Sequence, residues 1–184
     1  KRMYDNIKNK TKSLDILICN IGNSSPQNII GEENYKNWTK SLNINLLSAI
    51  NTIHYFKRLL KNSKNPSIVC ISSICGVRAI GAPIDYSVSK AALIAFVKNQ
   101  SRILSKDNIR INAISPGNII FNGSTWDKKI KSNKLKVKKY INDNVPLKKF
   151  GTTKNISDLV LFLSSDVSSF TTGANVVIDG GQTS

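Results

Sequence analysis

Apolar residues form two patterns that alternate along the chain: short continuous runs, and longer stretches that place one apolar face every three or four positions. The continuous runs predict four strands, at residues 14–19, 67–71, 109–114 and 175–178. The periodic stretches predict helices, with the end of a polar helix at 1–12 and further helices at 34–61, 86–105 and 155–163. Strands that alternate with helices are typical of a parallel sheet with crossover helices. No repeat or linker interrupts this order, so we predict one α/β domain over residues 1–184.

The composition of three predicted elements indicates how each is packed. The strand at 14–19 is almost continuously apolar, which predicts that both of its faces are covered. In the helix at 34–61, apolar residues that recur at helical spacing form the predicted core face: Trp38, Leu42, Leu46, Ala49, Ile53, Phe56 and Leu60. The stretch at 127–142 is rich in lysine, and we expect it to be either helical or mobile.

The chain is strongly basic, with 27 Lys and Arg against 11 Asp and Glu and a net charge of +16. Such a charge fits nucleic acid, a membrane surface or an acidic carrier as partner. The chain is also rich in Asn and Ile, with 22 Asn, a bias typical of an AT-rich genome. Its basic residues do not alternate with the stacking aromatics that single-strand binders use. We therefore expect solvated lysines and no nucleic-acid partner.

The remaining composition argues against a membrane or metal protein. No apolar run is long enough to span a bilayer, and no signal peptide is visible. Cys19, Cys70 and Cys75 do not have the spacing of a zinc site, and His54 is the only histidine. An odd number of thiols suits a reducing compartment. We expect a cytoplasmic protein without a membrane partner or a bound metal.

One segment carries residues suited to proton transfer. Tyr86 and Lys90 are four positions apart, so a helix places them on one face. A lysine ammonium stabilises a neighbouring phenolate, which predicts that the pKa of Tyr86 falls from its ordinary value toward neutrality. A general acid or base works best with such a pKa. Ser73 lies thirteen residues before Tyr86, which leaves room for a strand end, a loop and a helix start; Ser72 is the alternative serine.

Further elements occur in a fixed order around this segment. The tripeptide Asn20-Ile21-Gly22 follows an apolar strand, Asn45 lies twenty-eight residues before Ser73, and Ser115-Pro116-Gly117 ends another strand. Two stretches close the chain, at 146–152 and 172–181. In this order the elements resemble the classical short-chain dehydrogenase/reductase family over essentially the whole chain from residue 14. The resemblance implies a doubly wound, Rossmann-like parallel sheet.

The resemblance also implies roles for individual residues. The four catalytic residues that it implies are Asn45, Ser73, Tyr86 and Lys90. The residues that it places at the cofactor are Asn20, Gly22, Tyr86, Lys90, Pro116, Gly117 and Ile119. The implied reaction is hydride transfer between NAD or NADP and a carbonyl compound or secondary alcohol. The end of the chain is most similar to 3-oxoacyl-acyl-carrier-protein reductases, and the family commonly forms homo-oligomers through two long helices, here 35–60 and 86–105.

The family's glycine-rich cofactor turn has no counterpart here. No Gly-x-Gly-x-x-Gly occurs anywhere in the sequence, and the chain begins with Lys1 instead of methionine. We therefore expect that the N-terminal half of the doubly wound fold is missing. By the family's strand order, the strand at 14–19 would then lie at an unpaired sheet edge, an aggregation hazard. The residue that distinguishes NAD from NADP would lie in the missing part, so the sequence leaves that choice open.

Several alternatives stay open at this point. The chain could be a non-catalytic fragment or pseudoenzyme that acts only by association. A sugar-nucleotide epimerase or dehydratase uses the same Tyr and Lys, but it would need a larger C-terminal domain than the residues after Ile178 provide. The stretch at 126–149 contains nine lysines, and by resemblance it covers the substrate. Those lysines either attract an anionic substrate or form a solvated lid, and we favour the solvated lid.

Overall fold

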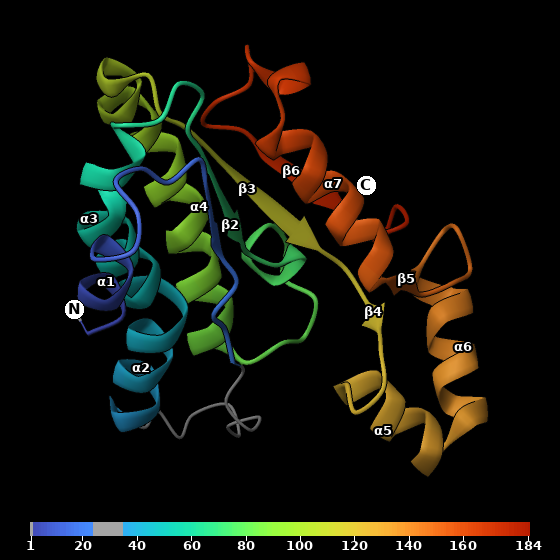
Figure 1. The fold of residues 1–184 in the computed structure, drawn as a ribbon. Coiled ribbons are helices and arrows are strands. Elements are labelled where there is room, and N and C mark those ends of the chain that lie inside the picture. The colour runs from blue at the N-terminus through green and yellow to red at the C-terminus, as the bar shows by residue number, and fades with distance from the viewer. Residues whose placement is uncertain (1, 24–34) are drawn as a thin grey trace.

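The centre of the molecule is a parallel sheet. The computed structural model describes residues 2–23 and 35–184, and Figure 1 shows their arrangement. Four strands form the sheet in the order β1-β2-β3-β6. Their bounds are Ile16–Cys19, Ser67–Ile71, Arg110–Pro116 and Asn175–Ile178. Every neighbouring pair is parallel, so the four strands end at one edge of the sheet.

Helices cover both faces of the sheet (Figure 1). On one face lie α1, α2, α3 and α4, whose bounds are Arg2–Lys8, Tyr35–Leu42, Ser48–Leu60 and Ile84–Leu104. Their core includes Ile53, Leu60 and Leu93, packed against Ile68 of β2 and Ile111 of β3. The opposite face carries α7, Thr153–Ser164, whose Leu163 packs on Val69 and Ile114. Consecutive side chains along β2 and β3 are buried, so both faces of these strands are covered by helices. The predicted α/β fold with a parallel sheet is confirmed.

The helix predicted at 34–61 is helical over Tyr35–Leu60, but it is not an α-helix throughout. Its first position, Asn34, lies outside the described residues, as does position 1 of the helix predicted at 1–12. The helical part divides into α2 and α3, with a π-helical turn at Asn43–Leu47 between them. A π turn inserts an extra residue into the hydrogen-bond ladder and frequently occurs at functional sites. Sequence periodicity does not register such an insertion, because the apolar face continues on both sides of it.

The edge strand β1 is covered on one face only. Leu17 and Cys19 are buried against the α3 and α4 side, whereas Ile16 and Ile18 are 45% and 39% exposed. The prediction that both faces are covered was therefore wrong for this strand. The physical reason is that α7, the helix on this face among the described residues, packs mainly over β2 and β3. The predicted position of β1 at the sheet edge is confirmed.

Two helices form a separate layer beyond the ends of the strands (Figure 1). They are α5, Thr125–Ser132, and α6, Lys134–Asn144, and we call them the lid. Short strands β4, Ile119–Ile120, and β5, Gly151–Thr152, pair in parallel and flank the lid in the chain. The stretch at 127–142, predicted to be helical or mobile, is thus helical and divided into two helices. Asn133 separates them, and its side-chain oxygen accepts a hydrogen bond from the amide of Lys136 at the start of α6.

The described residues also form three short 3-10 turns, at Ile74–Gly76 (η2), Ser105–Asp107 (η3) and Asp166–Ser168 (η4). The first of them joins β2 to the segment before α4 and packs against that helix. Over residues 2–23 and 35–184, no helix has both the length and the apolar character needed to cross a bilayer.

Candidate active site

The carboxyl ends of the parallel strands bring distant parts of the sequence together. Gly22 follows β1, Ser73 follows β2, and Pro116 and Gly117 lie at the end of β3. In open parallel sheets, ligands bind at this edge of the sheet. The polar and glycine-containing segments singled out in the sequence therefore meet where a ligand site is expected.

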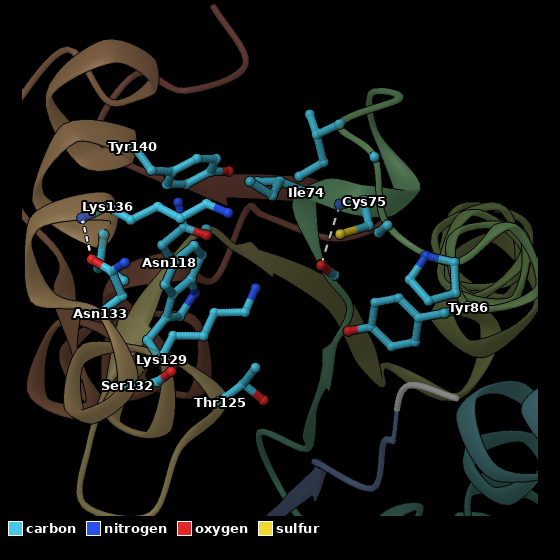
Figure 2. Close-up of a pocket in the computed structure, with 18 residues that line it drawn as sticks. Ile74, Cys75, Tyr86, Asn118, Thr125, Lys129, Ser132, Asn133, Lys136 and Tyr140 are labelled. Atoms are coloured by element: carbon cyan, nitrogen blue, oxygen red, sulfur yellow. Dashed lines mark hydrogen bonds between the residues drawn. The ribbon is translucent and has the colours of Figure 1, made fainter. Parts of the chain in front are cut away.

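A cavity of about 730 Å³ opens at this edge, between the sheet and the lid. Ser73, Tyr86, Gly117 and Asn118 are among the residues that line it. Figure 2 shows Tyr86 and Cys75 on one side of this space, with Lys129, Lys136 and the other lid residues facing them. The volume is within the range of small-molecule sites, about 300–1,000 Å³.

Tyr86 lies in the first turn of α4, and its ring lines the cavity. Burial raises the pKa of Tyr86, and a hydrogen bond with Ser73 lowers it by a smaller amount. The prediction of a pKa near neutrality was therefore wrong for this structure. The reason is that the loss of hydration around the phenolate outweighs the stabilisation from neighbouring groups. Tyr86 consequently keeps its proton at neutral pH.

Lys90 lies one helical turn beyond Tyr86, as the four-residue spacing predicted. Its Nζ is 5.9 Å from the centre of the Tyr86 ring and donates a hydrogen bond of 2.9 Å to the carbonyl oxygen of Ile71. The residue is only 3% exposed. Burial disfavours the ammonium and lowers the pKa of Lys90 to about 8. The pKa of Lys90 is thus much closer to neutral pH than that of an ordinary lysine.

The lowered pKa of Lys90 predicts a pH-dependent stability. Between pH 8 and 10.5 the unfolded chain holds a proton on Lys90 that the folded chain has released, so the free energy of unfolding rises with pH. Relative to Lys90→Met, which cannot titrate, the wild type should gain about 1.4 kcal/mol per pH unit in this window. Urea unfolding of both proteins at several pH values measures the difference. A difference that stays constant with pH would contradict the assigned shift.

The structure distinguishes the two serines at the end of β2. The hydroxyl of Ser72 donates a hydrogen bond of 2.9 Å to the carbonyl oxygen of Lys90 and does not line the cavity. Ser73 does line the cavity, and its oxygen accepts a hydrogen bond of 3.2 Å from the amide of Cys75 (Figure 2). Ser72 therefore ties β2 to α4, and Ser73 is the serine available to a ligand.

Asn45 is fully buried in the π-helical turn, behind the cavity wall. Its side-chain amide donates to the carbonyl oxygens of Asn23 and Ser41, and its oxygen accepts from the amide of Asn23 at 2.9 Å. The segment after β1 is thus anchored to the irregular turn. A side chain at Gly22 would place its Cβ 2.9 Å from the Nζ of Lys90 and 3.2 Å from Oδ1 of Asn45. Glycine at this position lets Lys90 and Asn45 approach the end of β1.

Glycine also has a steric role at the end of β3. A Cβ on Gly117 would lie 2.7 Å from the Cα of Asp179, so β3 and the turn after β6 can meet only because this residue lacks a side chain. Asp179 accepts hydrogen bonds from the backbone of Gly181 and Thr183 and fixes that turn. Pro116, Ile119, Asn20 and Gly22 do not line the cavity, in contrast to Gly117. Ile119 packs against Gly151 across the β4–β5 pair.

Several cavity residues were not predicted individually. Asn118 donates a hydrogen bond of 2.6 Å to the side chain of Gln182. On the lid, Trp126 stacks on Tyr140 with ring centres 5.1 Å apart, and Lys129 lies 4.7 Å from the Trp126 ring. The only sequence signal for this wall was its lysine content, because the stacked rings come from two different helices.

The proteins that this chain is similar to are reductases and dehydrogenases. A family model described as Enoyl-(Acyl carrier protein) reductase matches residues 1–183. Isoepoxydon dehydrogenase patN of Aspergillus clavatus is 31% identical, over 97% of this chain and 68% of its own length. The 3-oxoacyl-[acyl-carrier-protein] reductase FabG of Buchnera aphidicola subsp. Schizaphis graminum is 33% identical, over 94% of this chain and 68% of its own. The chain thus spans about two thirds of each of these relatives.

Solved structures show the same fold. The L-sorbose reductase of Gluconobacter frateurii, complexed with NADPH and L-sorbose, superposes with a TM-score of 0.90 at 25% identity. The match covers 98% of this chain and 71% of that protein. RhlG of Pseudomonas aeruginosa, in complex with NADP, has a TM-score of 0.88 at 25% identity, covering 98% of this chain and 70% of RhlG.

Proposed function

The chain belongs to the short-chain dehydrogenase/reductase family of NAD(P)-dependent oxidoreductases, and from that premise we propose that Tyr86, Ser73 and Lys90 form its catalytic centre. The reaction is hydride transfer between a nicotinamide cofactor and a carbonyl compound or secondary alcohol. The observation that carries this proposal is the position of Tyr86. Its ring lines the cavity together with Ser73, while Lys90 lies behind it on the same helix.

Each of the three residues has a distinct task in the reductive direction. Ser73 donates a hydrogen bond to the substrate carbonyl and orients it. Tyr86 holds a proton at neutral pH because burial raises its pKa, and it transfers this proton to the substrate oxygen as that oxygen becomes negative. Lys90, with a pKa of about 8, lies close enough to stabilise the resulting phenolate. In the oxidative direction Tyr86 accepts the hydroxyl proton.

The described residues fit the nicotinamide end of the cofactor. Gly117 and Asn118 line the same cavity as Tyr86, and the segment containing Asn20 and Gly22 lies beside Lys90. Pro116 at the end of β3 and Ile119 in β4 would support the nicotinamide. The hydride itself is supplied by the reduced nicotinamide when NADH or NADPH is bound. Asn45 would act as a positioning residue, because it holds the segment after β1, where Gly22 lies beside Lys90.

For the substrate, we propose a 3-oxoacyl group, as in the 3-oxoacyl-[acyl-carrier-protein] reductases among the relatives. The second candidate function is a non-catalytic fragment that acts by association. The observation in its favour is the exposed apolar edge at Ile16 and Ile18, which offers a surface for another chain.

Assembly and location complete the proposal. We propose a homo-oligomer formed through the helical segment Tyr35–Leu60 and α4, which together expose Tyr35, Leu47, Val88 and Ile103. Light scattering that shows a stable monomer would count against it. We also propose that the chain is a single domain and lies in the cytoplasm. The cytoplasmic location agrees with the three cysteines, which are all free thiols.

Cofactor binding tests this proposal. We would titrate NADH and NADPH against the 184-residue chain, and against the chain extended upstream in its gene, and follow the nicotinamide fluorescence. Binding by either protein supports the oxidoreductase and shows which cofactor it prefers. Absence of binding by both proteins would favour the non-catalytic alternative.

A further inference from the structure

The lysines of the lid fall into different groups according to where they lie. Lys131 on α5 and Lys139 on α6 form ion pairs one turn along their own helices, with Asp127 at 2.8 Å and Asp143 at 2.9 Å. Lys129 and Lys136 line the cavity instead. In the part of the chain that the structure describes, neither of them forms an ion pair. The lid thus directs two unneutralised ammonium groups toward the cavity, while acidic partners neutralise two lysines outside it.

The described lining of the cavity offers no acidic side chain to counter this charge. Among the described residues, those that line it include Lys129 and Lys136 but no Asp or Glu. The N-terminus of α6 lies at the same wall, where Asn133 caps the helix and also lines the cavity. A helix N-terminus adds a partial positive charge of its own. This wall is therefore suited to hold an anion.

The opposite wall carries the reacting groups. Tyr86 lies across the cavity from Lys129 and Lys136 of the lid (Figure 2). Ser73 lines the same cavity. A ligand that fills the space would meet hydrogen-bonding groups for a carbonyl at one side and ammonium groups at the other. Apolar residues such as Ile74 and Val137 also line the cavity.

We propose that the substrate is a carbonyl compound whose other end carries a carboxylate or phosphate, bound by Lys129 and Lys136 of the lid. This inference rests on the proposed oxidoreductase function and adds the charge of the substrate to it. Both anions are held by ammonium groups in the same way, so the experiment includes one arm for each. The solvated lid favoured from the sequence accounts for Lys131 and Lys139, but not for the two lysines of the cavity.

Trp126 provides a readout that does not depend on turnover. In the full chain carrying Trp38→Phe, Trp126 is the only tryptophan, because the sequence contains two. We would titrate this protein with 6-oxoheptanoate and its methyl ester, and with dihydroxyacetone phosphate and dihydroxyacetone. At least one anionic probe should bind about tenfold more tightly than its neutral partner, because two partly exposed charge pairs contribute this much. The pair with the larger ratio identifies the preferred anion.

Paired variants assign the effect to the cavity. In Lys129→Gln/Lys136→Gln the ratio should fall to about one. The matched control is Lys128→Gln/Lys138→Gln, which removes the same charge from exposed lid positions outside the cavity and should keep the ratio. Equal binding of the anionic and neutral probes, no binding of either, or an equal loss in the control would each overturn the inference.

A parallel assay separates this inference from the proposed function. The same probes are offered with NADH and NADPH, and nicotinamide oxidation is followed. Oxidation with anionic and neutral probes at equal kcat/KM would support the oxidoreductase and overturn the anionic substrate. Selective binding of the anion without any oxidation would support the lid site and count against the oxidoreductase.

Discussion

Replacement of Tyr86 by phenylalanine should reduce kcat by about 10²- to 10⁴-fold, the range that a positioned general acid contributes. The change removes only the hydroxyl, whose proton would otherwise reach the substrate oxygen. The ring still lines the cavity and still lies against Lys90. Cofactor affinity and the free energy of unfolding should therefore remain close to the wild-type values. Steady-state kinetics with NADPH, together with fluorescence titration of the cofactor, measure both parts of this prediction.

The control for this variant is Tyr140→Phe. Tyr140 lines the same cavity from the lid, and its hydroxyl accepts a hydrogen bond of 3.1 Å from Gln182. Removing that hydroxyl should change kcat by less than about tenfold, because it has no part in the proposed proton transfer. Equal losses in the two variants, or a Tyr86→Phe enzyme with normal kcat, would refute the assignment of Tyr86.

The second large effect concerns Gly76, where η2 contacts α4. A Cβ at this position would lie 2.6 Å from the amide nitrogen of Ala91 and 2.7 Å from the carbonyl carbon of Lys90. Both atoms belong to the helix backbone, which cannot move aside as a flexible side chain does. Gly76→Ala should therefore lower the free energy of unfolding by about 3 kcal/mol. For a chain of this size, the melting temperature should fall by roughly 6–12 °C.

This substitution should also reduce activity, because the displaced contact separates the Ser73 segment from the helix that carries Tyr86 and Lys90. The matched control is Ala79→Ser, an exposed position in the same loop, which should melt within about 2 °C of the wild type. Calorimetry of the three proteins measures the shifts. An unchanged melting temperature for Gly76→Ala would show that the loop and α4 are not packed as described.

The residues proposed to act in the reaction could be predicted, because spacing along the chain and the apolar pattern determine where they lie. The four-residue spacing of Tyr86 and Lys90 required only that their segment be helical, and it is. The alternating apolar runs required a parallel sheet, and the strands end where Ser73 and Gly117 were expected to meet. The thirteen-residue spacing to Tyr86 already favoured Ser73 over Ser72. The structure adds that Ser73 lines the cavity, whereas the Ser72 hydroxyl is bonded to the carbonyl oxygen of Lys90.

Features that depend on tertiary packing were not predictable. The apolar face of the 34–61 segment runs through Asn45, so periodicity concealed the π-helical turn. The stack of Trp126 on Tyr140 joins two helices whose separation at Asn133 the sequence left open. The pKa of Tyr86 depends on how completely its surroundings exclude water, and the spacing to Lys90 carries no information about that.

Transfer of deuteride from a labelled cofactor tests the proposed hydride transfer and the role of Tyr86. The enzyme would be supplied with a carbonyl substrate from the anionic probes and with NADPH, or NADH, deuterated at the hydride-donating carbon. We expect an alcohol that carries deuterium on its carbinol carbon, formed by the wild type at least about a hundredfold faster than by Tyr86→Phe. An alcohol without the label, or formation of the labelled alcohol at equal rates by both proteins, would contradict it.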